Sequence, residues 1–294
     1  MVTIYLNASA LKTLACPRRW YFTVRQGLVP KKALTNFAFG HAVHGYNEAV
    51  VRGTPPAQAI MTAMGHKGVD QSEVAKIMPL CMSFTPPTNV VMTEHGPAVE
   101  LYFEHEHSRR IINDEEVRIV NCGTLDLIRR DNAGWVNIVD YKTTRLVTPD
   151  SAFARYDNDV QFRYYDWAVW KFGYEFLPLD VHNLARDGKL ASCVCVGFMN
   201  ARPPCWKYGK MMQFSVAQRE EFDGMMNLLA EGIYKWWQVE DPPKTGWVNN
   251  ACKDCDFTSL CDNEDSIAAQ YLELLFERRE YNPSKFRDHD QPSG

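Results

Sequence analysis

Two aspartates and a lysine occur at regular spacing in two neighbouring segments near the middle of the chain. Asp126 lies in residues 116–130, and Asp140 and Lys142 lie in residues 134–143. Both segments are predicted strands, on which side chains two residues apart project from the same face. A hairpin between the two strands would bring Asp126 to the same place. We therefore expect two carboxylates and one cation to converge there.

This combination of groups suits the hydrolysis of a phosphodiester bond. Converging carboxylates make an oxygen site for Mg²⁺ or Mn²⁺, and a lysine beside them can orient a water molecule and stabilise charge on a phosphate. The alternative is a surface hairpin on which Asp140 and Lys142 form an ordinary salt bridge. The apolar residues Val136, Ile138 and Val139 favour a buried strand, where uncompensated charge is costly and more often marks a site.

Hydrophobic periodicity predicts the elements that must position these residues. The predicted helices cover residues 7–26, 36–52, 157–172 and 216–238, with shorter helical patterns at 57–65 and 71–82. The predicted strands cover residues 97–107, 116–130, 134–143, 191–199 and 206–215, and the turn Asp131-Asn132-Ala133-Gly134 joins two of them as a hairpin. The order of these elements indicates an α/β fold.

The residues around the aspartates resemble the motifs of a known family. Gly123-Thr124-Leu125-Asp126 followed by Val139-Asp140-Tyr141-Lys142-Thr143 is similar to the Gly-x-x-Asp and Asp-Tyr-Lys-Thr motifs of RecB-like nucleases of the PD-(D/E)XK type. Gly40-His41-Ala42-Val43-His44 resembles the Gly-x-x-x-His motif of that family. Its spacing favours His44 over His41 as a metal ligand. Gln161-Phe162-Arg163-Tyr164-Tyr165 resembles the family's Gln-x-x-x-Tyr motif, and Glu100 takes the place of a glutamate often found one strand earlier.

The resemblance implies a role for each matched residue. His44, Asp126 and Asp140 would bind Mg²⁺ or Mn²⁺, with the carbonyl of Tyr141 and the carboxylate of Glu100 as additional candidates. Lys142 would position the attacking water. Gln161 and Tyr165 would orient the DNA end or the lysine. The implied fold is a restriction-endonuclease-like core, in which a mixed central β-sheet is flanked by helices.

Four of the nine cysteines have a spacing typical of a metal site. Cys252, Cys255 and Cys261 lie close together, and Cys16 lies 236 residues before Cys252 (252 − 16). Four thiolates can hold a [4Fe–4S] cluster or a zinc ion, and spacing alone does not decide between them. AddB-like and CRISPR-associated RecB-like nucleases have a similar layout, which favours iron–sulfur. Such a cluster would act as a structural clasp.

Other cysteines are expected to be core residues and not metal ligands. Cys81 and Cys122 are expected to be buried thiols, and Cys193 and Cys195 share one face of a strand, as core residues would.

The motifs divide the chain into five expected parts. These are an N-terminal part with the first cysteine (1–35), a nuclease core (36–52 and 96–245), a helical insertion (53–95), a C-terminal cysteine segment (246–280) and a flexible tail (281–294).

Several residues are candidates for contacts with DNA. Arg18 and Arg19 could contact phosphates, and Trp20 could stack on a base, although Trp20 could equally pack in the core. Arg145 follows the proposed catalytic lysine and could touch the backbone. The formal net charge of −4 argues against a protein that coats nucleic acid non-specifically, but it permits a local basic groove.

Composition and the absence of certain motifs limit the remaining possibilities for location, activity and partners. The chain has no apolar run long enough to cross a membrane and no secretory signal, so we expect a cytoplasmic protein. We expect an exonuclease that acts on DNA ends or single-stranded DNA in recombination, repair, phage DNA processing or CRISPR adaptation. No helicase loop is present, so a helicase, recombinase or CRISPR adaptation protein could be its partner. The alternatives are a non-catalytic DNA-binding subunit stabilised by a metal cluster, and a zinc-stabilised interaction module.

Overall fold

The computed structural model describes residues 1–31, 35–65, 71–146, 148–156, 159–246, 251–253 and 255–279. The chain divides into two compact units. The terminal unit contains residues 1–33, 102–123 and 223–294, and the central unit contains residues 34–101 and 124–222. The predicted flexible tail at 281–294 lies outside the described residues. Within the described ranges, no helix is long and apolar enough to cross a membrane.

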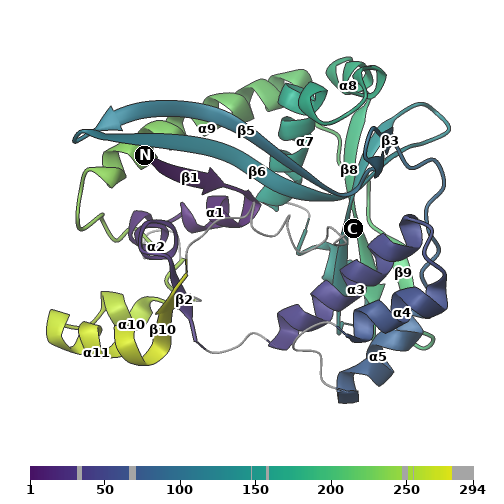
Figure 1. Ribbon diagram of the computed structural model, residues 1–294, viewed down its shortest axis with the longest axis horizontal. Helices are drawn as coiled ribbons and strands as arrows, with labels where there is room; N and C mark the ends of the chain where they lie inside the picture. The colour runs from purple at the N-terminus through teal and green to yellow at the C-terminus, as the bar shows by residue number, and fades with distance from the viewer. Residues whose placement is uncertain are drawn as a thin grey trace. The chain divides into compact units, whose positions relative to one another are not determined.

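One mixed β-sheet forms the framework of the fold, as predicted (Figure 1). Its strands are β1 (Val2–Leu6), β5 (Val99–Ile112), β6 (Glu115–Arg130), β7 (Val136–Thr144), β8 (Leu190–Phe198) and β9 (Cys205–Tyr208). They follow the order β1-β6-β7-β8-β9, with β5 also paired to β6. β1 is parallel to β6 and β7 is parallel to β8, whereas β6–β7 and β8–β9 are antiparallel.

The predicted hairpin between β6 and β7 is confirmed, and its turn has a local cause. The Oδ1 atom of Asp131 accepts hydrogen bonds of 2.9 Å from the backbone N–H groups of Ala133 and Trp135. Gly134 has φ +81°, a conformation that glycine adopts without a steric penalty. The turn therefore fixes which residues of β6 and β7 face each other.

Helices cover both faces of the sheet in the central unit. Helices α3 (Thr35–Val51), α4 (Pro56–Met64) and α5 (Gln71–Met82) lie side by side (Figure 1). They enclose a core that includes Val139 and Tyr141 of β7 and Cys193 and Cys195 of β8. On the opposite face, α6 (Pro149–Phe153) and α7 (Val160–Phe172) cover Val194, Val196 and Phe198. The predicted burial of β7 follows from its place between β6 and β8.

The helical stretch predicted for residues 7–26 is not one continuous helix, in line with the kink or end that Pro17 predicts within it. The structure has instead α1 (Ala8–Thr13), α2 (Pro17–Trp20) and a π-helical turn (Tyr21–Arg25). The break falls at Cys16, whose backbone is extended with φ −140° and which precedes Pro17. A residue before proline is pushed out of the helical region, and proline is well suited to begin a new helix. The break leaves Cys16 at the start of α2.

The other elements of the terminal unit join the two ends of the described chain. β2 (Leu28–Pro30) pairs with β10 (Phe276–Arg278), and their core contains Leu28, Phe257, Leu260 and Phe276. The helices α9 (Val216–Trp237), α10 (Thr258–Cys261) and α11 (Asp265–Leu275) complete the described C-terminal part. The predicted helix 216–238 agrees with α9, which begins in the central unit.

Some short elements were not predicted, or were predicted too long. β1, β3 (Met92–Thr93), β4 (Gly96–Pro97), α6, the 3₁₀ turn Gly173–Glu175 and α8 (Leu179–Arg186) are absent from the sequence prediction. The strand predicted for 206–215 ends at Tyr208, and beyond it only Met212 forms an isolated bridge, to Ser192. The buried state expected for Cys81, Cys122, Cys193 and Cys195 is confirmed.

Candidate metal and active site

The candidate site lies where β6 and β7 part. The paired stretch runs from Arg130–Val136 to Leu127–Val139, and the next residues in the register are Asp126 and Asp140. Beyond the last pair, the Oδ2 atom of Asp126 accepts a 2.7 Å hydrogen bond from the backbone N–H of Tyr141. The side chain of Asp126 thus satisfies a backbone donor that the diverging strand leaves open, and this fixes the direction of its carboxylate.

Asp140, Lys142 and Gln161 form one hydrogen-bonded group. The Nζ atom of Lys142 lies 2.8 Å from each carboxylate oxygen of Asp140, and its hydrogen bond goes to Oδ1. Gln161 Nε2 donates to the same Oδ1 at 2.7 Å. Gln161 is placed by the start of α7, where the carboxylate of Asp159 caps the helix and accepts a 3.0 Å hydrogen bond from the Gln161 N–H.

Burial and charge set the protonation of this group. Burial raises the pKa of Asp140 to about 6, with a further rise from Asp126 and an opposing effect from Lys142. Burial alone would lower the pKa of Lys142, but the carboxylates of Asp140 and Asp126 outweigh it and hold the pKa above its ordinary value. Lys142 is therefore a cation at neutral pH, held against a buried carboxylate.

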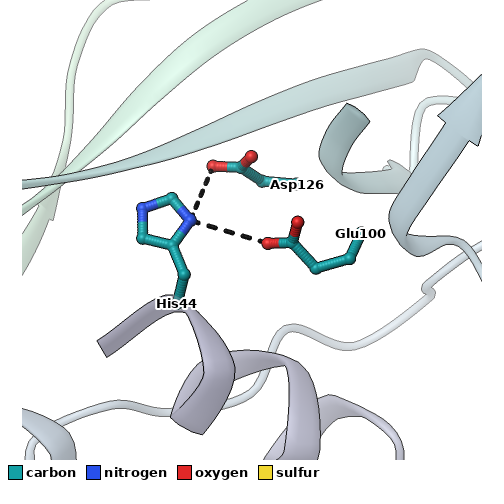
Figure 2. Close-up of side chains that lie close together, drawn as sticks. All are labelled: His44, Glu100 and Asp126. Carbon is teal, nitrogen blue, oxygen red and sulfur yellow. Dashed lines mark ion pairs between the residues drawn. The ribbon is translucent and has the colours of Figure 1, made fainter. Parts of the chain in front are cut away.

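A second group consists of His44, Glu100 and Asp126, which come from α3, β5 and β6 (Figure 2). The Nδ1 atom of His44 lies 3.5 Å from Glu100 Oε1 and 3.5 Å from Asp126 Oδ2. Their ligand atoms all lie within 4.8 Å of one another, and no other group of this kind is found in the described part of the chain. Burial would lower the pKa of His44, but Asp126 and Glu100 raise it to about 9.

These residues fit a divalent metal ion. One imidazole and carboxylates from several elements are donors that Mg²⁺ and Mn²⁺ accept. The Oδ2 atom of Asp140 is buried and accepts no hydrogen bond of good geometry from the described residues, although the Lys142 ammonium group lies 2.8 Å from it. A buried carboxylate oxygen with one cationic neighbour still has a lone pair that a metal ion can use. This atom is therefore an additional candidate ligand.

The backbone of Glu100 is strained. Its φ angle is +47°, in the left-handed region, which costs a non-glycine residue about 1–2 kcal/mol. Hydrogen bonds to the two preceding residues hold the chain: Ile128 N–H donates to the Ala98 carbonyl at 2.9 Å, and Arg52 Nη2 donates to the Val99 carbonyl at 3.0 Å. Strain that persists because its surroundings impose it is concentrated at functional sites. Here it aims the Glu100 carboxylate at His44.

This strain gives a test of the role of Glu100. In metal-free protein, we expect Glu100→Gly to be more stable than Glu100→Gln by about 1 kcal/mol, because only glycine relieves the backbone strain. Both variants should lose much of the stabilisation that added Mn²⁺ gives the wild type. Thermal unfolding with EDTA and with Mn²⁺ measures both effects. Equal metal-free stability of the two variants would contradict the strain argument. If Mn²⁺ stabilises both variants as much as it stabilises the wild type, Glu100 is not a ligand.

Two tyrosines border the group around Asp140. Tyr165 is 8% exposed, and its hydroxyl is hydrogen-bonded to Gln161, one turn earlier on α7. Burial, together with the charges of Asp140 and Asp126, raises its pKa. Tyr156 was missed by sequence reasoning: burial raises its pKa, and Lys142 and Asp140 lie close enough to act on it. No motif surrounds Tyr156, since it lies in a turn after α6 and only the tertiary fold brings it near.

The four predicted cluster cysteines all belong to the terminal unit, but they do not form a compact group of thiols. No three of the described cysteine sulfurs lie within 4.8 Å of one another. Cys16 and Cys252 both approach Gly246: the Gly246 N–H donates to the Cys16 thiol, and a Cβ at Gly246 would lie 2.9 Å from Cys252 Sγ. Cys255 and Cys261 lie near enough to Cys16 for its charge to act on them.

The predicted DNA contacts have mixed outcomes. Trp20 is fully buried and packs against Trp236, with ring centroids 5.9 Å apart, as the packing alternative predicts. Arg18 donates a 2.7 Å hydrogen bond to the Pro242 carbonyl and pairs with Asp241. Arg19 is half-buried, and Arg145 is exposed.

Comparisons with known proteins give a family match that covers most of the chain. A family model described as "PD-(D/E)XK nuclease superfamily" matches residues 5–262. A comparison with curated proteins gives no match. Among solved structures, the chain is similar to one described as "Crystal structure of SSO0001", with 13% identity, coverage of 87% of this chain and 84% of that chain, and a TM-score of 0.31. A likeness this distant supports no functional argument.

Proposed function

Because the chain belongs to the PD-(D/E)XK nuclease superfamily, we propose that it is a RecB-like deoxyribonuclease that requires Mg²⁺ or Mn²⁺. The observation that carries the proposal is the convergence of two groups at the parting of β6 and β7. His44, Glu100 and Asp126 form one group, and Asp140 and Lys142 belong to the other. The first group offers ligands for a metal ion, and the second holds the Lys142 ammonium group beside those ligands.

The proposed ligands are the side chains of His44, Glu100, Asp126 and Asp140, with the carbonyl of Tyr141 as an additional candidate. A divalent ion bound there would supply Lewis acidity to the scissile phosphate and lower the pKa of a water molecule. The Tyr141 N–H orients the Asp126 carboxylate for this role, and the Asp140 carboxylate is held by Lys142 and Gln161.

Lys142 and α7 carry the rest of the proposed reaction. The Lys142 ammonium group stays charged, so it can stabilise negative charge on the phosphate and hold the attacking water by a hydrogen bond. Gln161 is a positioning residue, because its amide holds Oδ1 of Asp140 at 2.7 Å. Tyr165 in turn is hydrogen-bonded to Gln161 and so supports its orientation. This differs from the sequence prediction, in which these two residues orient DNA or the lysine.

The raised pKa of His44 predicts a pH-dependent metal affinity. At pH 7 the metal-free imidazole is protonated, because its pKa is about 9. A metal ion binds the neutral form, so binding must release a proton. We expect the affinity for Mn²⁺ to rise up to about tenfold per pH unit between pH 6 and 8 and to level off above pH 9. Calorimetric titrations in two buffers of different ionisation enthalpy measure how many protons are released for each metal ion bound. Absence of proton release at pH 7 would remove His44 from the ligand set.

We also propose that Cys16, Cys252, Cys255 and Cys261 hold a [4Fe–4S] cluster, with zinc as the alternative. Support comes from the approach of Cys16 and Cys252 to Gly246 and from the backbone N–H groups that donate to the Cys16 thiol. These hydrogen bonds outweigh the effect of burial and lower its pKa. A lowered thiol pKa favours the thiolate, which is the form that binds metals.

Protein purified without oxygen tests the cluster. We expect a brown protein with about four iron atoms per chain, and loss of iron and colour in Cys252→Ala. Cys205→Ala is the matched control, since Cys205 is outside the proposed set. In Cys252→Ala, limited proteolysis should cut faster after Trp237. A colourless protein that contains one zinc per chain would establish the zinc alternative.

The nuclease proposal itself is tested with end-labelled single- and double-stranded DNA, incubated with Mn²⁺, Mg²⁺ or EDTA. Cleavage that needs a divalent ion supports it, and release of the label shows whether the enzyme acts from DNA ends. If intact protein binds DNA and cuts none with either ion, the chain is a non-catalytic DNA-binding subunit.

A further inference from the structure

The chain carries a long stretch without an acidic residue, although its formal net charge is −4. Residues 188–219 contain five lysines and arginines and no aspartate or glutamate. In the central unit they form β8, β9, the segments around them and the start of α9. One of these cations, Arg219, is buried against Asp166, and the other four are exposed. The stretch itself therefore contributes no carboxylate that would repel an anionic ligand.

The register of the sheet places one of these cations in line with Lys142. Lys142 of β7 pairs with Val196 of β8, and Val196 pairs with Lys207 of β9. Side chains of directly paired residues share a face of the sheet, so Lys207 lies on the face that carries Lys142. Two strand spacings, about 10 Å, separate the two residues. Both side chains are long and flexible, so their ammonium groups can approach each other closely enough to contact two phosphates of one nucleic-acid strand.

The surroundings of Lys207 leave its charge available. β9 ends the strand order of the sheet, and Lys207 is exposed. Among the residues that the structure describes, no ion pair engages it. Phe153 of α6 lies against the neighbouring Gly209, where a Cβ would meet its ring at 3.1 Å. A ligand on this face would therefore meet the Lys207 side chain beside the aromatic edge of α6.

An aromatic ring and a second cation occupy the other side of the same edge. Tyr208 is 45% exposed, and the guanidinium group of Arg129 lies 5.0 Å from its ring centroid. The neighbouring Trp206 is fixed, since its Nε1 donates a 3.1 Å hydrogen bond to the Leu80 carbonyl. Exposed aromatic rings among cations are the usual surface for sequence-independent binding of single strands.

We propose that the β9 edge binds the nucleic-acid strand next to the cleavage site, with Lys207 on a phosphate adjacent to the scissile one. Tyr208 offers a ring on which a base of the same strand can stack. This inference rests on the proposed nuclease function and adds to it a path for single-stranded substrate. The path would hold the strand while Lys142 and the metal ligands act on one phosphodiester.

Binding of a labelled twenty-nucleotide thymidine single strand in EDTA tests the path, because no strand is cut. We expect Lys207→Ala to weaken binding about five- to tenfold at low salt and to reduce the slope of log affinity against log salt by roughly 0.7, the share of one phosphate. Lys189→Ala is the matched control. It comes from the same acid-free stretch but lies seven residues before Val196, about 23 Å along β8, and should bind like wild type.

Cleavage kinetics give a second readout that a purely structural role would not produce. Lys207→Ala should raise KM for the long strand and leave kcat nearly unchanged. The difference should vanish on a dinucleotide, which has no adjacent phosphate. If wild type binds and cuts the long strand but Lys207→Ala keeps its affinity, salt slope and KM, the β9 edge is an ordinary solvated face and the inference is wrong. If wild type neither binds nor cuts, the proposed function fails and the inference falls with it.

Discussion

Replacing Lys142 by alanine should lower the rate of DNA cleavage about a thousandfold. The Lys142 ammonium group lies 2.8 Å from both oxygens of Asp140 and is the cation nearest the proposed ligands. In the proposed reaction Lys142 stabilises charge on the phosphate and holds the attacking water, and the substitution removes both contributions. Single-turnover cleavage of end-labelled DNA at saturating Mn²⁺ measures the loss in kcat. KM should change little, because the lysine acts in the transition state.

The same substitution also perturbs folding, and this must be separated from catalysis. Loss of Lys142 leaves the buried Asp140 without its cation. Asp140 can respond by taking up a proton, since its pKa is already raised to about 6. We therefore expect Lys142→Met, which keeps most of the side-chain packing, to retain a cooperative unfolding transition and Mn²⁺ binding. Lys189→Ala, at an exposed position, controls for a general loss of positive charge. Cleavage within threefold of wild type by folded Lys142→Met would exclude the assigned role.

The sequence was sufficient to predict those site residues whose positions depend on spacing along one strand or across one hairpin. Alternation along β7 places Asp140 and Lys142 on one face, and the turn at Asp131–Gly134 fixes the opposite register of Asp126. The strained backbone of Glu100 was not predictable, because it is imposed by hydrogen bonds from Arg52 and Ile128, which lie 48 and 28 residues away (100 − 52 and 128 − 100). Local propensity disfavours that conformation, so tertiary contacts must override it.

In the terminal unit, even more of the structure depends on tertiary contacts that the sequence did not predict. Cysteine spacing predicted that its two ends would meet, yet much of the contact between them does not involve cysteine. Arg18 binds the Pro242 carbonyl and Arg25 binds the Val239 carbonyl, across 224 and 214 residues. The pairing of β2 with β10 adds to them. Such contacts leave no periodic signal in a single sequence. They also mean that part of the association of the two ends would remain after loss of a cluster.

Substitutions in a buried ion pair of the central unit should have the second large effect, on the stability of the fold. Asp166 of α7 and Arg219 of α9 are 0% and 1% exposed, and their closest atoms are 2.5 Å apart. Arg219 also donates to the Leu190 carbonyl at 3.3 Å. The pair therefore ties α7 to α9 and to the start of β8. Helix α7 also carries Gln161, whose amide holds Asp140, so the pair supports the site from a distance.

Removing one partner of this pair should be far more damaging than removing both. We expect Arg219→Met to cost about 3–5 kcal/mol, because the Asp166 carboxylate is left buried without a cation. In a chain of this size that lowers Tm by roughly 10 °C. The double variant Asp166→Leu/Arg219→Met should recover most of the loss, since an apolar pair avoids the cost of desolvating two charges. Differential scanning calorimetry of the single and double variants measures the coupling. A double variant as unstable as Arg219→Met would mean that the hydrogen bond to the Leu190 carbonyl, and not the charge pair, anchors this end of α9.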